Sequence, residues 1–427
     1  MSKTSQDGYQ PASSGNPSAG NASRPEDRSR FNSRRLPLLL LMVLPLWLGG
    51  GGALLWTVPM MLVAALFLTW GAEVLQFSMA PGLVLALLAA VQTLPEFAVE
   101  AVLAWRGQVT LLLAGLTGAI RLLIGLGWPL VVWTAARRRR AAHRPAALAA
   151  SADRFWNYTL HIERIPRGTM LAWSVVLGYG LFIGLRLQLN AFDGVVLCLL
   201  YGVYLWRLRH GAVRHSSEAV QLDPIPAGLL RSPYRVAWVA ALFLFGILAF
   251  YIAPAPFLDA LIALAGGLGI SAFVSIQVLA PLVSEFPEQL SSYFLATRPG
   301  RASIGLLNLV ASNVNQWSLL LGMLPLVYSL SPHGAHWGTI PFDREQLAEW
   351  WLTLAQSGLA FALLLRGRVT VRNAGILFSL WLFQLASSLR VSVFADEVRW
   401  ASVGIYAAWM LGVALRWYRV RRRTAAA

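Results

Sequence analysis

Twelve long apolar segments constrain this chain more than any other feature of its sequence. Each is close to, or longer than, the ~20 residues that an α-helix needs to cross a bilayer. Within lipid every backbone N–H and C=O must be satisfied inside the segment, and runs of this length favour helices over barrel strands. The sequence therefore predicts an all-α polytopic membrane protein. The segments are residues 36–54, 56–77, 81–105, 109–135, 168–187, 191–207, 234–254, 268–296, 302–330, 347–366, 370–389 and 397–418.

Arginine clusters predict the orientation of these segments. Short cytoplasmic loops carry an excess of Lys and Arg. With twelve spans and a cytoplasmic N-terminus, every cluster falls in the cytoplasm, whereas Arg106, Arg186 and Arg390 fall outside. We therefore expect an inner- or plasma-membrane protein with both termini cytoplasmic, whose net charge of +16 reflects topology rather than nucleic-acid binding. The clusters are 137–140, 207–235, 298–301, 366–372 and 419–423.

A Pro-Glu pair occurs deep inside two of the apolar segments. The first is Leu94-Pro95-Glu96 and the second is Phe286-Pro287-Glu288. Proline removes a backbone donor and loosens a helix, so a matched pair of broken helices is expected. The copies lie on the third and eighth segments and therefore cross the membrane in opposite directions. Such an inverted repeat predicts a binding site near the bilayer midplane.

The repeat divides the chain into two five-span units with one extra span at each end. Residues 1–35 are rich in Ser, Pro, Asn, Gly and Arg, which is typical of a disordered tail. The predicted order is a cytoplasmic tail 1–35, an extra span 36–54, a first repeat 55–207 with a cytoplasmic loop 136–167, a cytoplasmic linker 208–233, a second repeat 234–390, an extra span 391–418, and a basic cytoplasmic tail 419–427.

Polar side chains gather around both Pro-Glu pairs. Ionisable residues inside a membrane usually face a partner or a pathway. Glu96 and Glu288 could hold one divalent cation or share protons, since hard cations prefer oxygen ligands. A structural role as hydrogen-bonding contacts between helices is the alternative for the amides. The further candidates are Gln92, Thr93 and Glu100 near Glu96, Ser284, Glu285 and Ser292 near Glu288, and Ser312, Asn313, Asn315 and Gln316 on the following segment.

Arg121 lies near the middle of the segment that follows the first Pro-Glu pair. An unpaired guanidinium at that depth is very costly, so we expect it to pair with a carboxylate. Glu96 and Glu100 are the nearest candidates by repeat geometry, in which case Arg121 is an internal counterion that replaces a mobile cation. A pair with Glu73, away from the pathway, is the alternative.

At these residues the sequence resembles the calcium/cation antiporter superfamily, which includes sodium/calcium exchangers. That family carries two inverted repeats, each with a G-T-S-L-P-E motif followed by a G-S-N-I-x-N/D motif. The stretches 91–96 and 283–288 resemble the first motif, and 307–316 is similar to the second. The resemblance covers both repeat cores, and it implies the exchanger fold and cation antiport.

The resemblance also implies roles for individual residues. The central carboxylates fall on Glu96 and Glu288, with flanking ligands at Gln92, Thr93, Ser284 and Glu285. Ligands from the partner helices fall on Thr117 and Arg121 in the first repeat, and on Ser312 and Gln316 in the second, with Asn313 beside them. Three positions depart from the family pattern: Arg121 stands at a ligand position, Glu285 replaces a hydroxyl, and Gln92 is bulkier than Thr.

The expected function is alternating-access antiport, most simply of calcium against sodium. Exchange of calcium or another cation against protons is the alternative, and so is a non-transporting protein locked by an internal Arg-Glu pair. Membrane lipid and the transported cations are the expected partners, and no sequence feature sets an oligomeric state. No nucleophile-base pair, phosphate loop or Cys/His metal spacing is present, so neither an enzyme nor a cofactor is expected.

Overall fold

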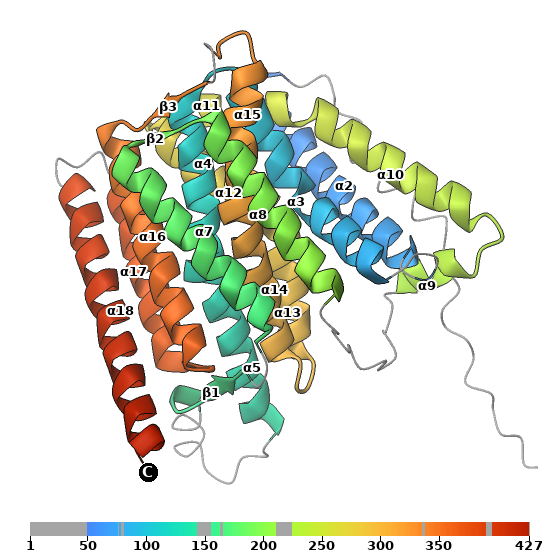
Figure 1. Ribbon diagram of the computed structural model, residues 1–427. Helices are drawn as coiled ribbons and strands as arrows, with labels where there is room; N and C mark the ends of the chain where they lie inside the picture. Colours follow the sequence, from blue (N-terminus) through green and yellow to red (C-terminus); the bar gives the residue numbers. More distant parts are fainter. Residues whose placement is uncertain are drawn as a thin grey trace, which may run out of the picture.

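The chain forms a bundle of long, tilted helices in a computed structural model (Figure 1). The structure describes residues 49–75, 77, 81–142, 155–162, 165–210, 224–334, 338–389 and 395–426. Within these residues, seven helices have the length and apolar composition needed to cross a membrane. The protein is therefore an integral membrane protein, as predicted.

Most predicted segments coincide with helices in the structure. The match includes α3, which runs without interruption over Pro81–Trp105 although it contains Pro95. The predicted segment 36–54 lies almost wholly outside the described residues, apart from the short helix η2 (Gly50–Ala53) at its end. The other matching helices are α2 (Leu54–Leu75), α7 (Arg167–Arg186), α8 (Ala191–His210), α10 (Arg235–Ile252), α16 (Arg344–Leu365), α17 (Val371–Leu389) and α18 (Ala395–Ala426).

The second Pro-Glu segment is broken, whereas the first is not. The predicted span 268–296 consists of α12 (Ala272–Ser284) and α13 (Phe286–Thr297), which meet at Glu285. The expectation of two matched broken helices is therefore wrong for α3. One proline in a helix removes a single hydrogen bond, but α12 and α13 contain two prolines, Pro281 and Pro287, on either side of their junction.

The helices that follow both Pro-Glu pairs share a different interruption. In the first, α4 (Val109–Leu122) continues through a π-helical turn, η3 (Leu123–Gly127), into α5 (Trp128–Ala142). In the second, α14 (Ala302–Asn315) continues through η4 (Gln316–Leu320) into α15 (Leu321–Leu330). Short π-helical turns inside α-helices occur frequently at functional sites. Here η4 begins with a residue predicted to lie at the site.

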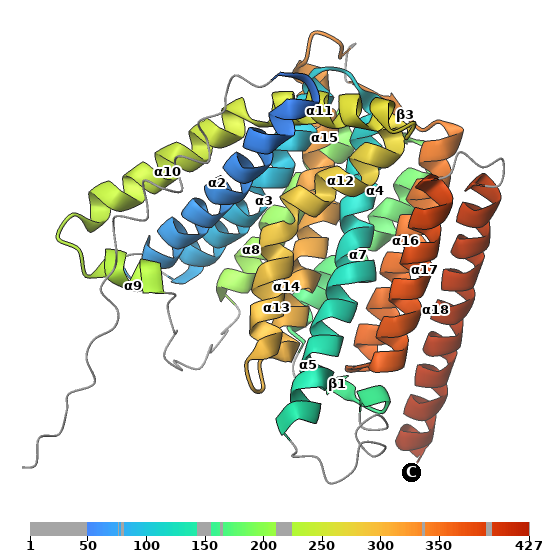
Figure 2. The ribbon, with the colours of Figure 1, turned by 180° about the vertical axis from the view of Figure 1, so that it is seen from behind.

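One stretch between two predicted spans is a helix. Residues 255–267 separate the predicted spans 234–254 and 268–296, which predicts an outer loop, but α11 spans Pro254–Gly267. Proline at the first turn starts a helix without loss of a hydrogen bond, and the apolar side chains of Phe257, Leu258 and Leu261 are buried. α11 lies at the same end of the bundle as the strands β2 and β3 (Figures 1 and 2). A second short helix, α9 (Pro224–Leu230), lies in the predicted linker.

Two short strand pairs join loops at opposite ends of the bundle. β1 (Thr159–His161) pairs antiparallel with β4 (Arg368–Thr370), so that Leu160 faces Val369. β2 (Gln188–Leu189) pairs with β3 (Ile340–Pro341) in the same sense. In the predicted topology the first pair joins two cytoplasmic loops and the second joins two outer loops. The C-terminus lies at the same end as β1 (Figure 1).

The buried centre of the bundle contains α4, whose side chains from Leu112 to Leu122 are all buried. Tryptophans of the neighbouring helices pack against each other here: Trp317 of η4 lies edge-on to Trp350 of α16, with a distance of 5.3 Å between the ring centroids. By contrast, α10 and α18 lie at opposite edges of the bundle (Figure 1). Both edge helices carry several exposed large apolar side chains, as expected for helices that face lipid.

The contact between α4 and α12 fixes the position of the Glu285 junction, and it depends on Gly118. A Cβ atom there would overlap the backbone carbonyl of Gln277 in α12. We expect Gly118→Ala to lower stability by about 1–3 kcal/mol, as overpacking does. Gly178→Ala in α7 is the matched control because nothing lies within 4 Å of its Cβ position. Thermal unfolding of both purified variants measures the difference, and equal stability would contradict the packing argument.

Candidate functional site

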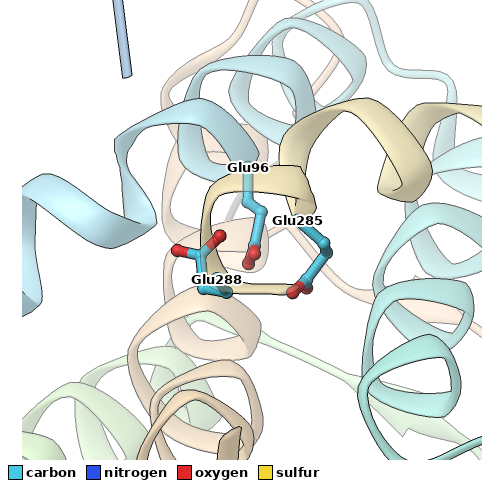
Figure 3. A group of neighbouring side chains, drawn as sticks. All are labelled: Glu96, Glu285 and Glu288. Carbon is cyan, nitrogen blue, oxygen red and sulfur yellow. The ribbon is translucent and has the colours of Figure 1, made fainter. Parts of the chain in front are cut away.

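Three buried glutamates meet where α3 passes the junction of α12 and α13 (Figure 3). They are Glu96, Glu285 and Glu288, here called the glutamate triad. One carboxylate oxygen from each lies within 4.8 Å of the others. Their exposed fractions are 3%, 0% and 2% respectively. Residues nearly two hundred positions apart in the chain therefore form one compact group of acids.

The break between α12 and α13 places two of these acids. The amide of Glu285 donates to the carbonyl of Pro281 at 2.8 Å, which closes the end of α12. The carbonyl of Glu285 accepts from the amide of Gln289 at 3.1 Å, which starts α13. Glu288 then lies in the first turn of α13, where the helix dipole favours a negative charge. The junction thus directs two carboxylates to the same place as Glu96.

Gln316 joins the two sides of the triad. Its Nε2 donates to Oε2 of Glu96 at 3.1 Å and also to Oε1 of Glu285. Gln316 is the first residue of η4 and is fully buried, and its Oε1 has no hydrogen-bond partner. One neutral amide therefore holds carboxylates from α3 and from the α12–α13 junction, while its own oxygen remains available.

No cationic side chain neutralises the triad among the residues that the structure describes. None of the ion pairs of those residues includes Glu96, Glu285 or Glu288. Both oxygens of Glu288, Oε1 of Glu96 and Oε2 of Glu285 are buried without a hydrogen-bond partner. A buried charge without compensation costs several kcal/mol. The site therefore requires a cation or protons.

The other predicted ligands have varied surroundings. Thr93 and Ser284 are buried and precede Glu96 and Glu285 in the chain. Asn313 is fully buried; its Nδ2 donates to the carbonyl of Leu309 at 2.9 Å and its Oδ1 has no partner. Ser312 is only half-buried. Gln92 belongs to α3, but its side chain lies outside the described part of the structure. Ligation by these five residues stays a prediction.

Glu100 lies one turn beyond Glu96 on α3 and is not part of the triad. Its side chain is 5% exposed, and Oε2 has no partner. The carboxylate packs directly against Gly115 of α4, where any Cβ would overlap it. A glycine at this place thus provides the space for a fourth buried acid next to the site.

Arg121 pairs with neither of its predicted partners. Its Nη2 lies 2.7 Å from Oε2 of Glu349 in α16, and both side chains are buried. The predicted pairs with Glu96 or Glu100, and the alternative pair with Glu73, are therefore wrong. Periodicity along α4 could not reveal this partner, because the contact depends on which helix packs beside it.

Glu349 belongs to a larger ionic network that the sequence analysis missed. Its Oε1 lies 2.7 Å from Nε of Arg399 in α18. Arg399 also contacts Glu345 at 2.7 Å and Asp396 at 2.9 Å. The network joins α4, α16 and α18 and is separate from the triad. An acid inside one predicted span and an arginine inside another were the available signals.

Three carboxylates and a nearby amide oxygen suit a divalent cation. Calcium takes six to eight oxygen ligands, from carboxylates, amides and backbone carbonyls. The triad offers four carboxylate oxygens without hydrogen-bond partners, and Gln316 offers one amide oxygen. Protons can also bind here, because closely spaced carboxylates resist simultaneous ionisation. The same oxygen atoms could therefore bind either a divalent cation or protons in competition.

The sequence matches a known family over most of its length. The family model described as "Sodium/calcium exchanger protein" matches residues 50–208 and 238–390. Among curated proteins, none matches the sequence.

Solved exchanger structures are similar to this chain. One described as the H+/Ca2+ exchanger CAX is 28% identical, covers 90% of this chain and 95% of its own, and has a TM-score of 0.76. Native YfkE is 13% identical, with coverage of 83% and 97% and a TM-score of 0.58. The sodium-calcium exchanger NCX_Mj, soaked with Na+ and Sr2+, is 18% identical, with coverage of 80% and 98% and a TM-score of 0.50. The last two support the fold alone.

Proposed function

Because the chain belongs to the sodium/calcium exchanger family, we propose that it is a cation antiporter that carries calcium at the glutamate triad. The observation that carries the proposal is the absence of any cationic partner for Glu96, Glu285 and Glu288 within the described residues. A mobile cation supplies the missing charge. None of the matches reported above is to a catalytic family, so transport rather than catalysis is the proposed activity.

We propose protons as the counter-ion. Two protons carry the same charge as one calcium ion, so three carboxylates can exchange one for the other with no change in site charge. Similarity to an H+/Ca2+ exchanger, over nearly the whole of both chains, supports this choice. Sodium, the counter-ion favoured by the sequence analysis, is the second candidate because the family is named for it.

The proposed transport cycle uses the predicted twelve-span layout. Two inverted five-helix repeats would alternately expose the triad to each side, with both termini in the cytoplasm. The π-helical turns η3 and η4, at corresponding places after both Pro-Glu pairs, support the repeat. The strand pairs support the sidedness, since each joins loops that the layout places on one side.

The locked, non-transporting alternative depended on a pair between Arg121 and a glutamate of the site. Arg121 instead pairs with Glu349, outside the triad. Among the described residues, the triad carboxylates therefore have no fixed counterion, which favours a site that exchanges mobile ions.

Calcium uptake into proteoliposomes tests the proposal. The purified chain is reconstituted in calcium-free vesicles, and uptake is compared under an outward proton gradient, an outward sodium gradient, and neither. We expect uptake with the proton gradient. Uptake with the sodium gradient alone would show that sodium, not protons, is the counter-ion. If the protein is folded and no uptake occurs under either gradient, the proposal of calcium antiport is wrong.

A further inference from the structure

A second polar site lies at the end of the bundle that carries β1 and the C-terminus. A pocket of about 560 Å³ opens between the end of α5, strand β1 and the turn from α13 to α14. These elements come from both predicted repeats. The polar side chains that line the pocket are Arg138, Arg139, Tyr158, Thr159, His161, Arg298 and Ser303.

The pocket is strongly basic. Three guanidinium groups line it, from Arg138, Arg139 and Arg298, and none of the described residues that line it is Asp or Glu. Arg139 lies over the ring of Tyr158, with its Cζ 5.8 Å from the ring centroid. Burial raises the pKa of the Tyr158 hydroxyl, so this group stays protonated and able to donate. Hydrogen-bond donors and positive charges therefore predominate around this pocket.

The start of α14 adds backbone donors to the same place. Ala302 and Ser303 line the pocket, and no side-chain hydrogen bond caps the helix at Arg301. The first N–H groups of a helix lack intrahelical partners, and the helix dipole makes this end positive. Gly300, with φ of +71°, makes the turn that brings Arg298 next to these groups.

We propose that this pocket binds an anionic phosphate group, carried by a membrane lipid headgroup or by a soluble phosphate. Guanidinium groups bind phosphate oxygens through paired, charge-assisted hydrogen bonds, and three of them lie around a volume large enough for such a group. Topology alone accounts for arginines in a loop, but not for their convergence with Tyr158 and a helix start on one hollow.

The bound phosphate would connect the pocket to the glutamate triad through α13. That helix spans Phe286–Thr297, so it contains Glu288 in its first turn and ends one residue before Arg298, which lines the pocket. A ligand held by both Arg298 and Arg138 would fix this helix against α5. The pocket therefore regulates the mobility of one side of the proposed transport site.

The test compares two double variants of the full chain in nanodiscs. Arg138→Gln/Arg298→Gln removes two charges from the pocket. Arg231→Gln/Arg235→Gln removes two exposed charges from the same predicted side, beside α9 and α10. Thermal unfolding is measured in phosphatidylcholine discs, in discs with increasing phosphatidylglycerol, and in phosphatidylcholine discs with increasing inorganic phosphate. Stabilisation in the second series identifies a lipid headgroup, and stabilisation in the third identifies a soluble phosphate.

We expect the wild type and the Arg231/Arg235 variant to be stabilised equally. The Arg138/Arg298 variant should need at least about tenfold more ligand, because each lost hydrogen bond to a charged group weakens binding on that order. Equal responses of both variants, or no stabilisation of the wild type by either ligand, would overturn the proposal. This measurement does not depend on calcium transport, so it stands or fails separately from the proposed function.

Discussion

Glu288→Gln is expected to abolish saturable calcium uptake, with a loss of about 100-fold or more. Calcium affinity depends on the number of charged ligands, and even residues that only support a metal ligand contribute about 10–100-fold. Glu288 offers two carboxylate oxygens without hydrogen-bond partners, so its charge is the most readily available in the triad. The measurement is the initial rate of uptake into proteoliposomes against external calcium.

The same variant should fold at least as well as the wild type. The substitution removes a buried charge that has no cationic partner among the described residues, so the melting temperature measured without calcium should not fall. Stabilisation by added calcium should disappear. Glu100→Gln is the matched control, because it neutralises an equally buried acid of α3 outside the triad and should keep saturable uptake. Normal uptake by a well-folded Glu288→Gln protein would refute the assignment of the site.

Arg121→Met is expected to destabilise the protein by about 3 kcal/mol while leaving ion coupling unchanged. Removing one partner of a buried ion pair leaves an uncompensated charge, which typically costs ~3–5 kcal/mol. Here Arg399 still contacts Glu349, which places the loss at the lower end of that range. Thermal unfolding gives the stability, and the ratio of calcium to counter-ion flux gives the coupling.

Two further variants show whether the loss comes from the pair itself. Arg121→Met/Glu349→Gln should regain part of the lost stability, because the negative charge next to the missing guanidinium is also removed and Arg399 keeps Glu345 and Asp396 as partners. Arg106→Met is the exposed comparison, because it breaks the pair of Arg106 (32% exposed) with Asp259 (60% exposed). It should lower the stability by no more than about 1 kcal/mol. A changed coupling ratio in Arg121→Met would mean that the guanidinium does take part in ion binding.

The residues that converge on the triad were predictable because the local signal was strong. A Pro-Glu pair inside an apolar run is rare, and two copies indicated where Glu96 and Glu288 would meet. Glu285 and Gln316 followed from their spacing relative to these copies and from the family resemblance. Membership of the exchanger family is confirmed, whereas cation binding by each residue stays a prediction.

Features that depend on packing between distant segments were not predictable. The partner of Arg121 is set by the contact between α4 and α16, and no pattern within either helix specifies it. α11 has 14 residues, fewer than the ~20 that a spanning helix needs, so the length of its apolar run does not predict a span. The strands β2 and β3 are two residues long, too short for an alternating pattern to be visible.

The neutral side-chain amide of Gln316 bears on uncoupled movement of the carrier, in which it would change orientation without a bound ion. It holds Glu96 and Glu285 in place through hydrogen bonds, but a neutral group cannot cancel their charge. A carrier that reoriented without its cargo would move this uncompensated charge through the apolar interior, at a cost of several kcal/mol. In the proposed transport cycle, this electrostatic cost would suppress slippage, and each turn of the carrier would require an ion in both directions.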